Sequence, residues 1–164
     1  MKKSNAEKTV TDSKSLKVNE EKWSKQLMDA GWTVFPNVFL ARQKAIGLDA
    51  VDINILMHLA SYWWKPGDKP FPSKKTIAEA MQINPRTVQR RIANLEKINF
   101  VRREERRISK VGSKPNIYHL DGLIKAAIPY AQEMIEKKEE NIARTEAIRA
   151  KRGKPKLALV KTDE

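Results

Sequence analysis

The chain has 164 residues, enough for one domain of ordinary size with room for extensions. Its 33 Lys and Arg against 20 Asp and Glu give a net charge of +13, which is typical of a protein that binds nucleic acid or another polyanion. The absence of cysteine excludes disulfides, thiolate metal sites and a cysteine nucleophile, and no apolar run approaches the roughly 20 residues of a membrane span, so we expect an intracellular protein without membrane contact.

The first 22 residues are polar, mixed in charge and without apolar periodicity. Because they cannot bury enough surface to offset the entropy of ordering, we expect residues 1–22 to form a disordered tail. From Trp32 onward, aromatic and aliphatic residues mix around Pro36, and Asn37 to Lys44 favour a short helix. The folded domain is therefore expected to begin at residue 32.

A longer helix is predicted to follow, with Asp49 as its N-cap and Asp52 favourably placed in the first turn. It should end near Trp64, where Lys-Pro-Gly interrupts the pattern. The apolar face of this helix comprises Val51, Ile55, Leu56 and Leu59.

Two further helices are predicted in close succession. Ser73 caps a short helix, "KKTIAEAM", and Asn84 followed by Pro85 marks the start of the next one, which should end at Asn99 in a left-handed conformation. The residues expected to point inward from the short helix are Ile77, Ala78 and Met81. Two helices separated by so short a turn must cross steeply, which is the helix-turn-helix arrangement.

The second of these helices has two chemically distinct faces. Val88, Ile92 and Leu95 gather on one side of a helical wheel. The other side carries Arg86, Arg90, Ala93, Asn94 and Lys97. Arginine matches both guanine edges and phosphate, so this face suits a DNA major groove; a merely solvated basic face is the alternative.

Two short strands, "FVRREERR" and "NIYHL", are predicted next, joined by the loop "ISKVGSKP". Their arginines could pair with Glu104 and Glu105 across the hairpin. However, residues 84–116 contain ten Lys and Arg against three Glu. Local pairing cannot cancel that surplus, so we expect this hairpin to form a wing that meets phosphate.

The pattern "PSKKTIAEAMQINPRTVQRRIANLEKINFVRREERR…GSKPNIYHLDGL" resembles the winged helix-turn-helix family of bacterial, plasmid and phage regulators and replication initiators. The resemblance spans about Trp32 to Leu123. It implies a mainly α fold with a small β-hairpin wing (α+β), a DNA-binding domain at residues 32–122 and a C-terminal helical extension. Gln82 and Asn99 stand where the family often has glycine, and both positions are expected to be left-handed.

These arguments give a set of expected contacts with double-stranded DNA. The expected base-reading residues are Arg86, Thr87, Gln89, Arg90 and Asn94. The expected phosphate contacts are Ser73, Lys74, Lys75, Arg91, Lys97, Arg106, Arg107, Lys110 and Lys114. Arg91 lies nearer the core side of its helix, so either the DNA backbone or a carboxylate is its expected partner.

No cofactor or metal site is expected. Trp63 and Trp64 could stack bases of a single strand, but adjacent tryptophans before a proline loop more often cover a small core. His58 and His119 have no partner at metal-binding spacing, so we expect structural roles for both.

Residues 123–150 are predicted to form a helical arm in two pieces, because Pro129 can restart or kink a helix. An isoleucine seam, interrupted by Lys138 and Thr145, leaves open an arm packed on the domain or a homodimer. The seam comprises Ile124, Ile128, Ala131, Ile135 and Ile142. Residues 151–164 should form a basic disordered tail.

The sequence thus predicts a cytoplasmic, nucleoid-associated protein that binds specific DNA and acts in transcription regulation or in DNA replication of a bacterial mobile element. The alternative is an adaptor that recruits a partner through its C-terminal helices, with DNA binding secondary. No glycine-rich phosphate loop or nucleophile with a base is present, so we expect no enzyme.

Overall fold

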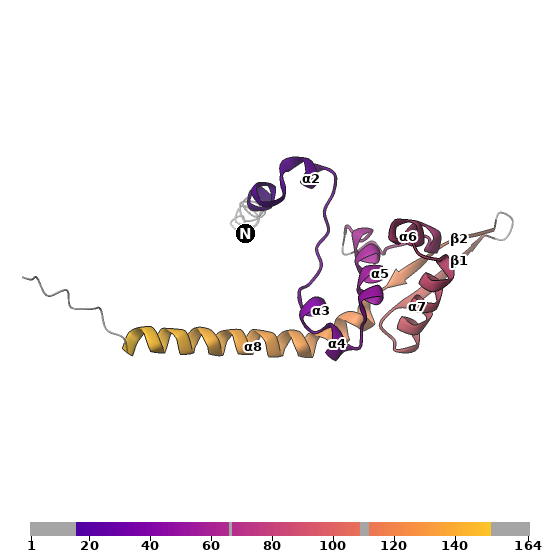
Figure 1. Cartoon of the computed structure of the whole chain (residues 1–164). Coiled ribbons are helices and arrows are strands. Elements are labelled where there is room, and N and C mark those ends of the chain that lie inside the picture. Colours follow the sequence, from indigo (N-terminus) through magenta and orange to yellow (C-terminus); the bar gives the residue numbers. More distant parts are fainter. Residues whose placement is uncertain (1–15, 66, 109–111, 152–164) are drawn as a thin grey trace, which may run out of the picture.

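The computed structural model describes residues 16–65, 67–108 and 112–151. Residues 16–23 are helical, and the elements that follow are α2 (Lys25–Asp29), α3 (Val38–Ala41), α4 (Gln43–Ile46), α5 (Ala50–Ser61), α6 (Lys74–Met81), α7 (Pro85–Lys97), β1 (Arg102–Ile108), β2 (Gly112–His119) and α8 (Asp121–Lys151). The helices α5, α6 and α7 pack together, a hairpin extends from one side of them, and α8 runs away on the other (Figure 1).

Helix α5 begins with the predicted cap. Asp49 accepts the backbone N–H groups of Val51 and Asp52, both at 2.9 Å, and the Asp52 carboxylate accepts the N–H of Asp49 at 3.2 Å. This reciprocal capping box satisfies donors that the first turn of a helix leaves without partners. Because its direction is fixed there, α5 places Leu56 and Leu59 in the core with none of their surface exposed.

The helix-turn-helix is confirmed at the residues that define it. Ser73 Oγ accepts the Thr76 N–H at 3.0 Å to begin α6, and Asn84 Oδ1 accepts the Arg86 N–H at 2.8 Å to begin α7. Gln82 ends α6 in the left-handed conformation, with φ 53° and ψ 41°. The chain therefore reverses direction within three residues, which forces α6 and α7 to cross.

The apolar side of α7 is buried as predicted. Val88 and Ile92 are fully buried and Leu95 is 2% exposed, in one core with Ile77 of α6 and Tyr118 of β2. Full burial stabilises by about 1.5–3 kcal/mol for each aliphatic side chain of this size. Burial of this face leaves the opposite face of α7 toward solvent.

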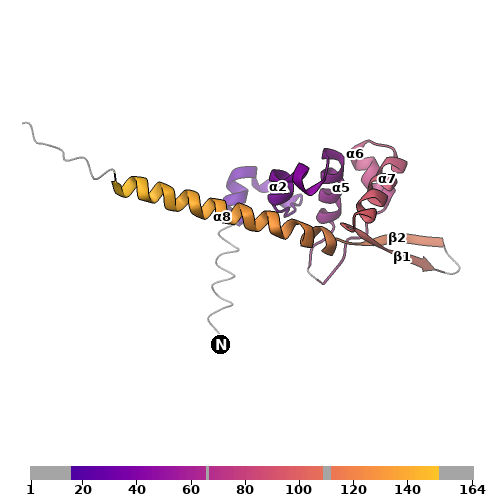
Figure 2. The same ribbon diagram turned by 90° about the horizontal axis from the view of Figure 1, so that it is seen from below.

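The wing is a two-stranded antiparallel hairpin with one irregularity. The register changes between Glu104, which faces Ile117, and Arg106, which faces Lys114. Pro115 lies at this step and cannot donate a backbone hydrogen bond to the opposite strand, so a bulge accommodates it. The hairpin projects beyond α6 and α7 (Figure 2).

Helix α8 runs unbroken from Asp121 to Lys151 and contains Pro129, so the expectation of two helical pieces is wrong. Buried Leu123 and Ala127 lie before the proline, and half-buried Tyr130 packs on the core after it. Packing on both sides of Pro129 offsets the loss of one helical hydrogen bond.

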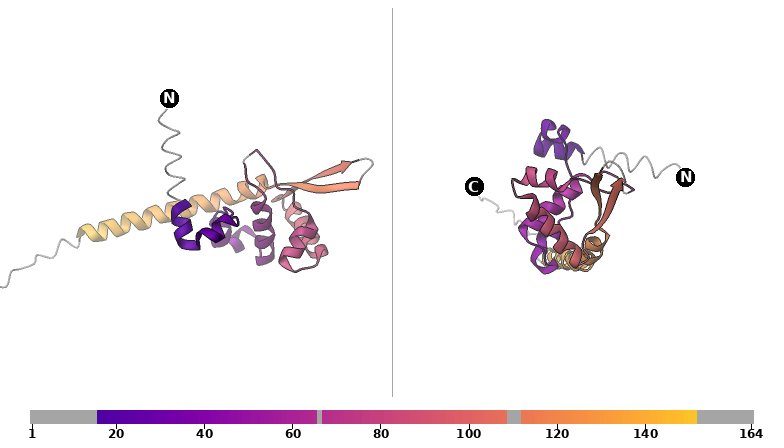
Figure 3. Two further views of the ribbon diagram at one scale, coloured as in Figure 1. Left: turned by 90° about the horizontal axis from the view of Figure 1, so that it is seen from above. Right: turned by 90° about the vertical axis from the view of Figure 1, so that its right-hand side faces the viewer.

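Two side-chain contacts hold the first half of α8 to the rest of the fold. The Tyr130 hydroxyl donates to the Ala45 carbonyl at 2.9 Å, and Arg42 pairs with Glu133 at 3.2 Å. Beyond Glu133 the helix extends past the other described helices as a rod, with residues 135–150 exposed (Figure 3). Both points of attachment lie in its first half.

Three expectations about segment boundaries are corrected. Residues 16–22 are helical, so they do not belong to a disordered tail, and Lys151 is the last helical residue of α8. Two short helices, α3 and α4, stand where one helix was expected between residues 37 and 44. The remaining parts of the two expected tails, residues 1–15 and 152–164, lie outside the described residues.

Candidate nucleic-acid interface

The exposed face of α7 gathers four of the five expected base-reading residues. Arg86, Gln89 and Arg90 are exposed and Thr87 is half-buried. With Asn84 and Ala93 they line one shallow hollow on the surface of this helix. Asn94, the fifth residue, lines a different hollow toward the start of α5. The structure thus separates Asn94 from the other four.

The first turn of α7 is suited to an anion. It contains no acidic residue, and its N-terminus carries the positive end of the helix dipole. Arg86 and Arg90 are four residues apart, so they are neighbours on one face of this helix. Their charges reinforce the positive potential of the helix end.

The two helices of the helix-turn-helix are connected through polar side chains at this surface. Lys74 of α6 donates to Gln89 of α7 at 3.1 Å. This bond fixes the amide of Gln89 through its oxygen, which leaves the amide N–H₂ group to donate elsewhere.

A second hollow lies between the start of α6 and the wing. Four expected phosphate contacts line it, together with Pro115, Asn116 and Tyr118 of β2: Ser73, Lys74, Lys75 and Lys114. The hydroxyl of Ser73 already accepts the Thr76 N–H as a helix cap, and Lys75 pairs with Glu79 at 3.7 Å. Lys74, Lys75 and Lys114 therefore bring three cations to the hollow at the junction of helix and wing.

Arg91 is engaged inside the fold. Its guanidinium binds Asp49 and lies 3.7 Å from Asp52. Burial alone would raise the pKa of Asp49, but backbone hydrogen bonds and the charge of Arg91 outweigh it and lower that pKa. At Asp52, which is 8% exposed, burial prevails and raises the pKa. Arg91 thus has the carboxylate partner expected from its position, and we exclude it from the proposed phosphate contacts.

The other expected phosphate contacts are more scattered. Lys97 is exposed in the last turn of α7, at the opposite end from Arg86. Arg106 lies on β1 beside Phe71, with its guanidinium carbon 4.8 Å from the centre of the ring. The side chain of Arg107 and all of Lys110 fall outside the described part of the chain.

Two side-chain contacts at this surface were not predicted from the sequence. Glu96 of α7 pairs with Arg103 of β1 at 2.5 Å, and Phe71 lies against Arg106. An acidic residue at the end of a basic helix is the signal that points to the first pair. The second pair is brought together only by the fold.

The two adjacent tryptophans differ in burial, and each histidine residue has a hydrogen-bond partner within the fold. Trp63 packs against the core, as expected of a cover, whereas Trp64 is 68% exposed. His119 Nε2 lies 2.9 Å from Glu104 across the wing, and the His58 carbonyl accepts the Ser61 hydroxyl at 2.8 Å. Among the described residues, no group of three or more His, Asp or Glu is placed to hold a metal ion.

These elements define a mainly helical winged helix-turn-helix fold with a two-stranded antiparallel hairpin and a long C-terminal helix. Residues 47–101 match the family model described as a helix-turn-helix domain. The matched segment contains α5, α6 and α7 and ends just before the wing. This match and the exposed basic face of α7 support a DNA-binding domain.

Comparison with solved structures finds only loose similarity. A protein of Methanosarcina mazei Go1, described as a possible transcriptional regulator, is 14% identical with a TM-score of 0.41, over 62% of this chain and 82% of that one. MepR, a transcription regulator of the Staphylococcus aureus multidrug efflux pump MepA, is 17% identical with a TM-score of 0.37, over 71% of this chain and 93% of that one. No curated protein matches this chain.

Within the described ranges, no helix combines the length and apolar character needed to cross a membrane.

Proposed function

We propose that this protein binds specific double-stranded DNA sequences, with α7 in the major groove, and regulates transcription in the bacterial cytoplasm. The observation that carries the proposal is the exposed face of α7, where Arg86, Thr87, Gln89 and Arg90 share one hollow. A major groove admits an α-helix, and side chains of these types match the hydrogen-bonding edges of bases. The protein would act by binding and would require no cofactor or catalysis.

Arg86 and Arg90 are the leading candidates for guanine recognition, because both are exposed in the N-terminal half of α7. Gln89 suits adenine, because its amide N–H₂ group can donate to N7 and its oxygen, which accepts from Lys74, has a second lone pair to accept from N6. Asn94 and Lys97 lie further along the helix and would meet the sugar-phosphate backbone or the edge of the site. This division assigns base reading to the start of the helix.

Phosphate contacts would come from the hollow between α6 and the wing. Lys74, Lys75 and Lys114 are within this group, and Ser73 shapes it as the cap of α6. Arg106 extends the group along β1, and we propose that Arg107 and Lys110 continue it. Such contacts fix the register of the protein on the duplex without reading sequence.

The biological process has two candidates. Regulation of transcription is the principal proposal, and initiation of replication of a plasmid or phage is the rival carried by the sequence resemblance. A pool of random duplexes selected by the protein tests both, since an inverted repeat suits a symmetric regulator and an array of direct repeats suits an initiator. Failure to enrich any sequence would contradict site-specific recognition.

Salt dependence provides a separate test of DNA binding. With four to six phosphate contacts, log affinity should fall with log salt at a slope of about −4 to −5. Lys114→Ala should flatten this slope and weaken all duplexes equally, because its side chain is proposed to touch only backbone. A slope near zero for the unaltered protein would exclude the proposed mode of binding.

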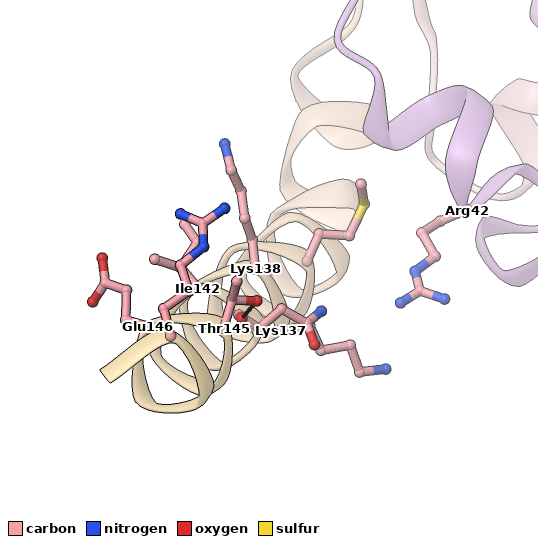
Figure 4. Close-up of a pocket in the computed structure, with 9 residues that line it drawn as sticks. Arg42, Lys137, Lys138, Ile142, Thr145 and Glu146 are labelled. Atoms are coloured by element: carbon pink, nitrogen blue, oxygen red, sulfur yellow. Dashed lines mark hydrogen bonds between the residues drawn. The ribbon is translucent and has the colours of Figure 1, made fainter. Parts of the chain in front are cut away.

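We further propose that α8 joins two copies of the chain. Ile135, Ile142 and Ile148 are 56%, 48% and 46% exposed on the part of α8 beyond Glu133. Figure 4 shows Ile142 and Lys138 on this rod, with Arg42 on a neighbouring segment. Ile135 and Ile142 are seven residues apart and therefore share one face of the helix, which favours a partner helix. The same surface supports the second candidate function, an adaptor that recruits a different protein.

Capture experiments separate these two roles. If α8 joins copies of this chain, the full-length protein should assemble alone in solution. If it serves an adaptor, the protein should remain monomeric and capture another protein through residues 134–151, and substitution of Arg86 and Arg90 should leave this capture intact. A monomer that captures nothing would contradict both roles for α8.

A further inference from the structure

Phe71 is an exposed aromatic residue at a junction of three elements. It lies two residues before the Ser73 cap of α6 and is 55% exposed. The neighbouring Pro70 is buried, and its carbonyl accepts the Tyr118 N–H of β2 at 2.9 Å. The backbone beside Phe71 is therefore fixed against the wing, although the ring itself faces solvent.

Arg106 of β1 completes this junction through two contacts. Its guanidinium carbon lies 4.8 Å from the centre of the Phe71 ring, within the range of a cation–π interaction. Its Nε donates to the Pro115 carbonyl of β2 at 2.9 Å. One arginine thus binds the loop before α6 and the bulged strand of the wing at the same time.

The bulge in the hairpin places Arg106 beside the hollow that the lysines line. Arg106 is the first residue of β1 after the register changes, and its partner in the register is Lys114. Lys114 and Pro115 also line the hollow that contains Ser73, Lys74 and Lys75. The guanidinium of Arg106 is therefore held beside the cluster proposed to bind phosphate.

We propose that Phe71 is a positioning residue that holds the guanidinium of Arg106 for contact with a DNA phosphate at the junction of α6 and the wing. This inference rests on the proposed DNA binding. The ring covers one face of the guanidinium and the Pro115 carbonyl binds Nε, which leaves the terminal N–H groups to donate to phosphate oxygens. Because the side chain is ordered before DNA arrives, less conformational entropy is lost on binding.

The positioning step can be measured on the free, full-length protein by NMR. In the unaltered chain, the Arg106 Hε resonance should be shifted by the ring and should exchange slowly with water, because Nε donates to Pro115. Phe71→Leu keeps an apolar side chain but removes the aromatic face, so the shift should vanish and exchange should accelerate. Phe71→Trp should restore both properties. Unchanged Arg106 exchange in Phe71→Leu would overturn the inference without any reference to DNA.

The contribution to binding is measured by titrating a labelled random-sequence duplex against the same variants. Phe71→Leu should weaken affinity by about two- to tenfold, the equivalent of ordering one flexible side chain. Arg106→Ala should weaken it at least as much and reduce the salt slope by about 0.9, the loss of one phosphate contact. The double variant should be no weaker than Arg106→Ala alone, because Phe71 acts through Arg106.

Trp64→Leu is the matched control, since it removes an exposed aromatic side chain from the same loop. It should change neither the Arg106 resonance nor the affinity. Fully additive losses from Phe71→Leu and Arg106→Ala would show that the ring acts by itself and would overturn the positioning role. If the unaltered protein binds no duplex at all, the proposed function fails, while the NMR comparison still decides whether Phe71 holds Arg106.

Discussion

The carboxylate of Glu96, near the end of α7, binds both the backbone N–H and the guanidinium of Arg103 on β1. The carboxylate accepts the Arg103 N–H at 3.1 Å and pairs with the guanidinium at 2.5 Å. The hydrogen bond that the Arg103 guanidinium donates to Glu96 raises the pKa of Arg103 above its ordinary value. About a quarter of each side chain is exposed. The pair therefore fixes the wing to the helix proposed to read DNA.

Replacement of Glu96 by Gln should destabilise the fold by about 1–3 kcal/mol, because Arg103 would lose a largely desolvated charged partner. Urea unfolding of the purified protein measures this loss. Glu79→Gln is the matched control, since the pair of Glu79 with Lys75 is largely exposed and spans one helical turn. Equal stability of the two variants would show that the Glu96–Arg103 pair stabilises the fold no more than an exposed ion pair does.

Replacement of Arg90 by Ala should lower affinity for the selected DNA site by about 1–3 kcal/mol and relax preference at one base pair, if Arg90 binds guanine through both terminal nitrogens. Binding to random DNA should change little. Competition between selected and random duplexes measures the difference. Equal losses on both would assign Arg90 to phosphate.

Two variants of the same helix distinguish base reading from folding. Arg91→Ala should reduce stability because Asp49 and Asp52 lose their cation. Leu95→Ala should cost about 2–5 kcal/mol by opening a cavity, and should weaken binding to every duplex through unfolding. Neither variant should change which sequence is preferred.

Low pH should remove the contribution of the ionised Asp49 to the stability of the fold. Its pKa is lowered in the folded state, so its stabilising effect is present above the ordinary value of 3.8 and is lost as pH falls through the folded pKa. Asp49→Asn keeps a good helix cap but removes the charge beside Arg91. At pH 7 this variant should be slightly less stable, by under about 1 kcal/mol for a half-exposed pair, and the difference should vanish in acid.

Asp52 should affect the pH dependence of stability in the opposite direction, and Asp52→Asn tests this. The pKa of Asp52 is raised, so its ionisation costs stability as pH rises from 3.8 through the folded pKa. Thermal unfolding measured from pH 2 to pH 7 should therefore show the melting temperature of the wild type falling relative to that of Asp52→Asn as pH rises. Parallel stability curves for the wild type and both variants would refute these assignments.

Gly122 should tolerate no side chain. An added Cβ would lie 1.7 Å from the backbone oxygen of Asn99, which is itself left-handed with φ 59°. Gly122→Ala must displace α8 or the end of α7, and should cost about 1–3 kcal/mol or more. Calorimetry should show a lower melting temperature, whereas Gly67→Ala, with open space around its Cβ, should remain close to wild type.

Substitution of Ile135 and Ile142 by Asp should convert an α8-mediated dimer to a monomer, because a charge at the seam opposes helix pairing. Sedimentation equilibrium measures the mass, and circular dichroism checks that the domain remains folded. Ala147→Asp is the control, since it places the same charge away from the seam. An unchanged mass in the double variant would exclude this interface.

Local signals in the sequence predicted most of the fold. Asp49, Ser73 and Asn84 cap their helices as expected, and Gln82 and Asn99 are left-handed as expected. Each of these features depends on residues within a few positions of one another, so the chain itself specifies them.

The features that the sequence left open or missed depend on contacts distant in sequence. A carboxylate was one of the two expected partners of Arg91, but Asp49 lies 42 residues away along the chain, and Phe71 meets Arg106 only after the wing has folded against the loop before α6. Pro129 remains inside α8 because tertiary packing outweighs its local preference to end a helix. On the exposed face of α7, the sequence predicted the residue types, but only the fold shows that Asn94 lines a different hollow and that Arg91 is bound by Asp49.

The continuity of α8 makes it a lever. Its first half is fixed at Gly122, Tyr130 and Glu133, whereas its last 18 residues extend freely for about 27 Å at 1.5 Å per residue. A load applied to that free end is transmitted as torque to the base of the helix. There Gly122 touches Asn99, directly after α7 ends. A partner bound to the far end of α8, as proposed above, would therefore act on the orientation of α7 through this contact.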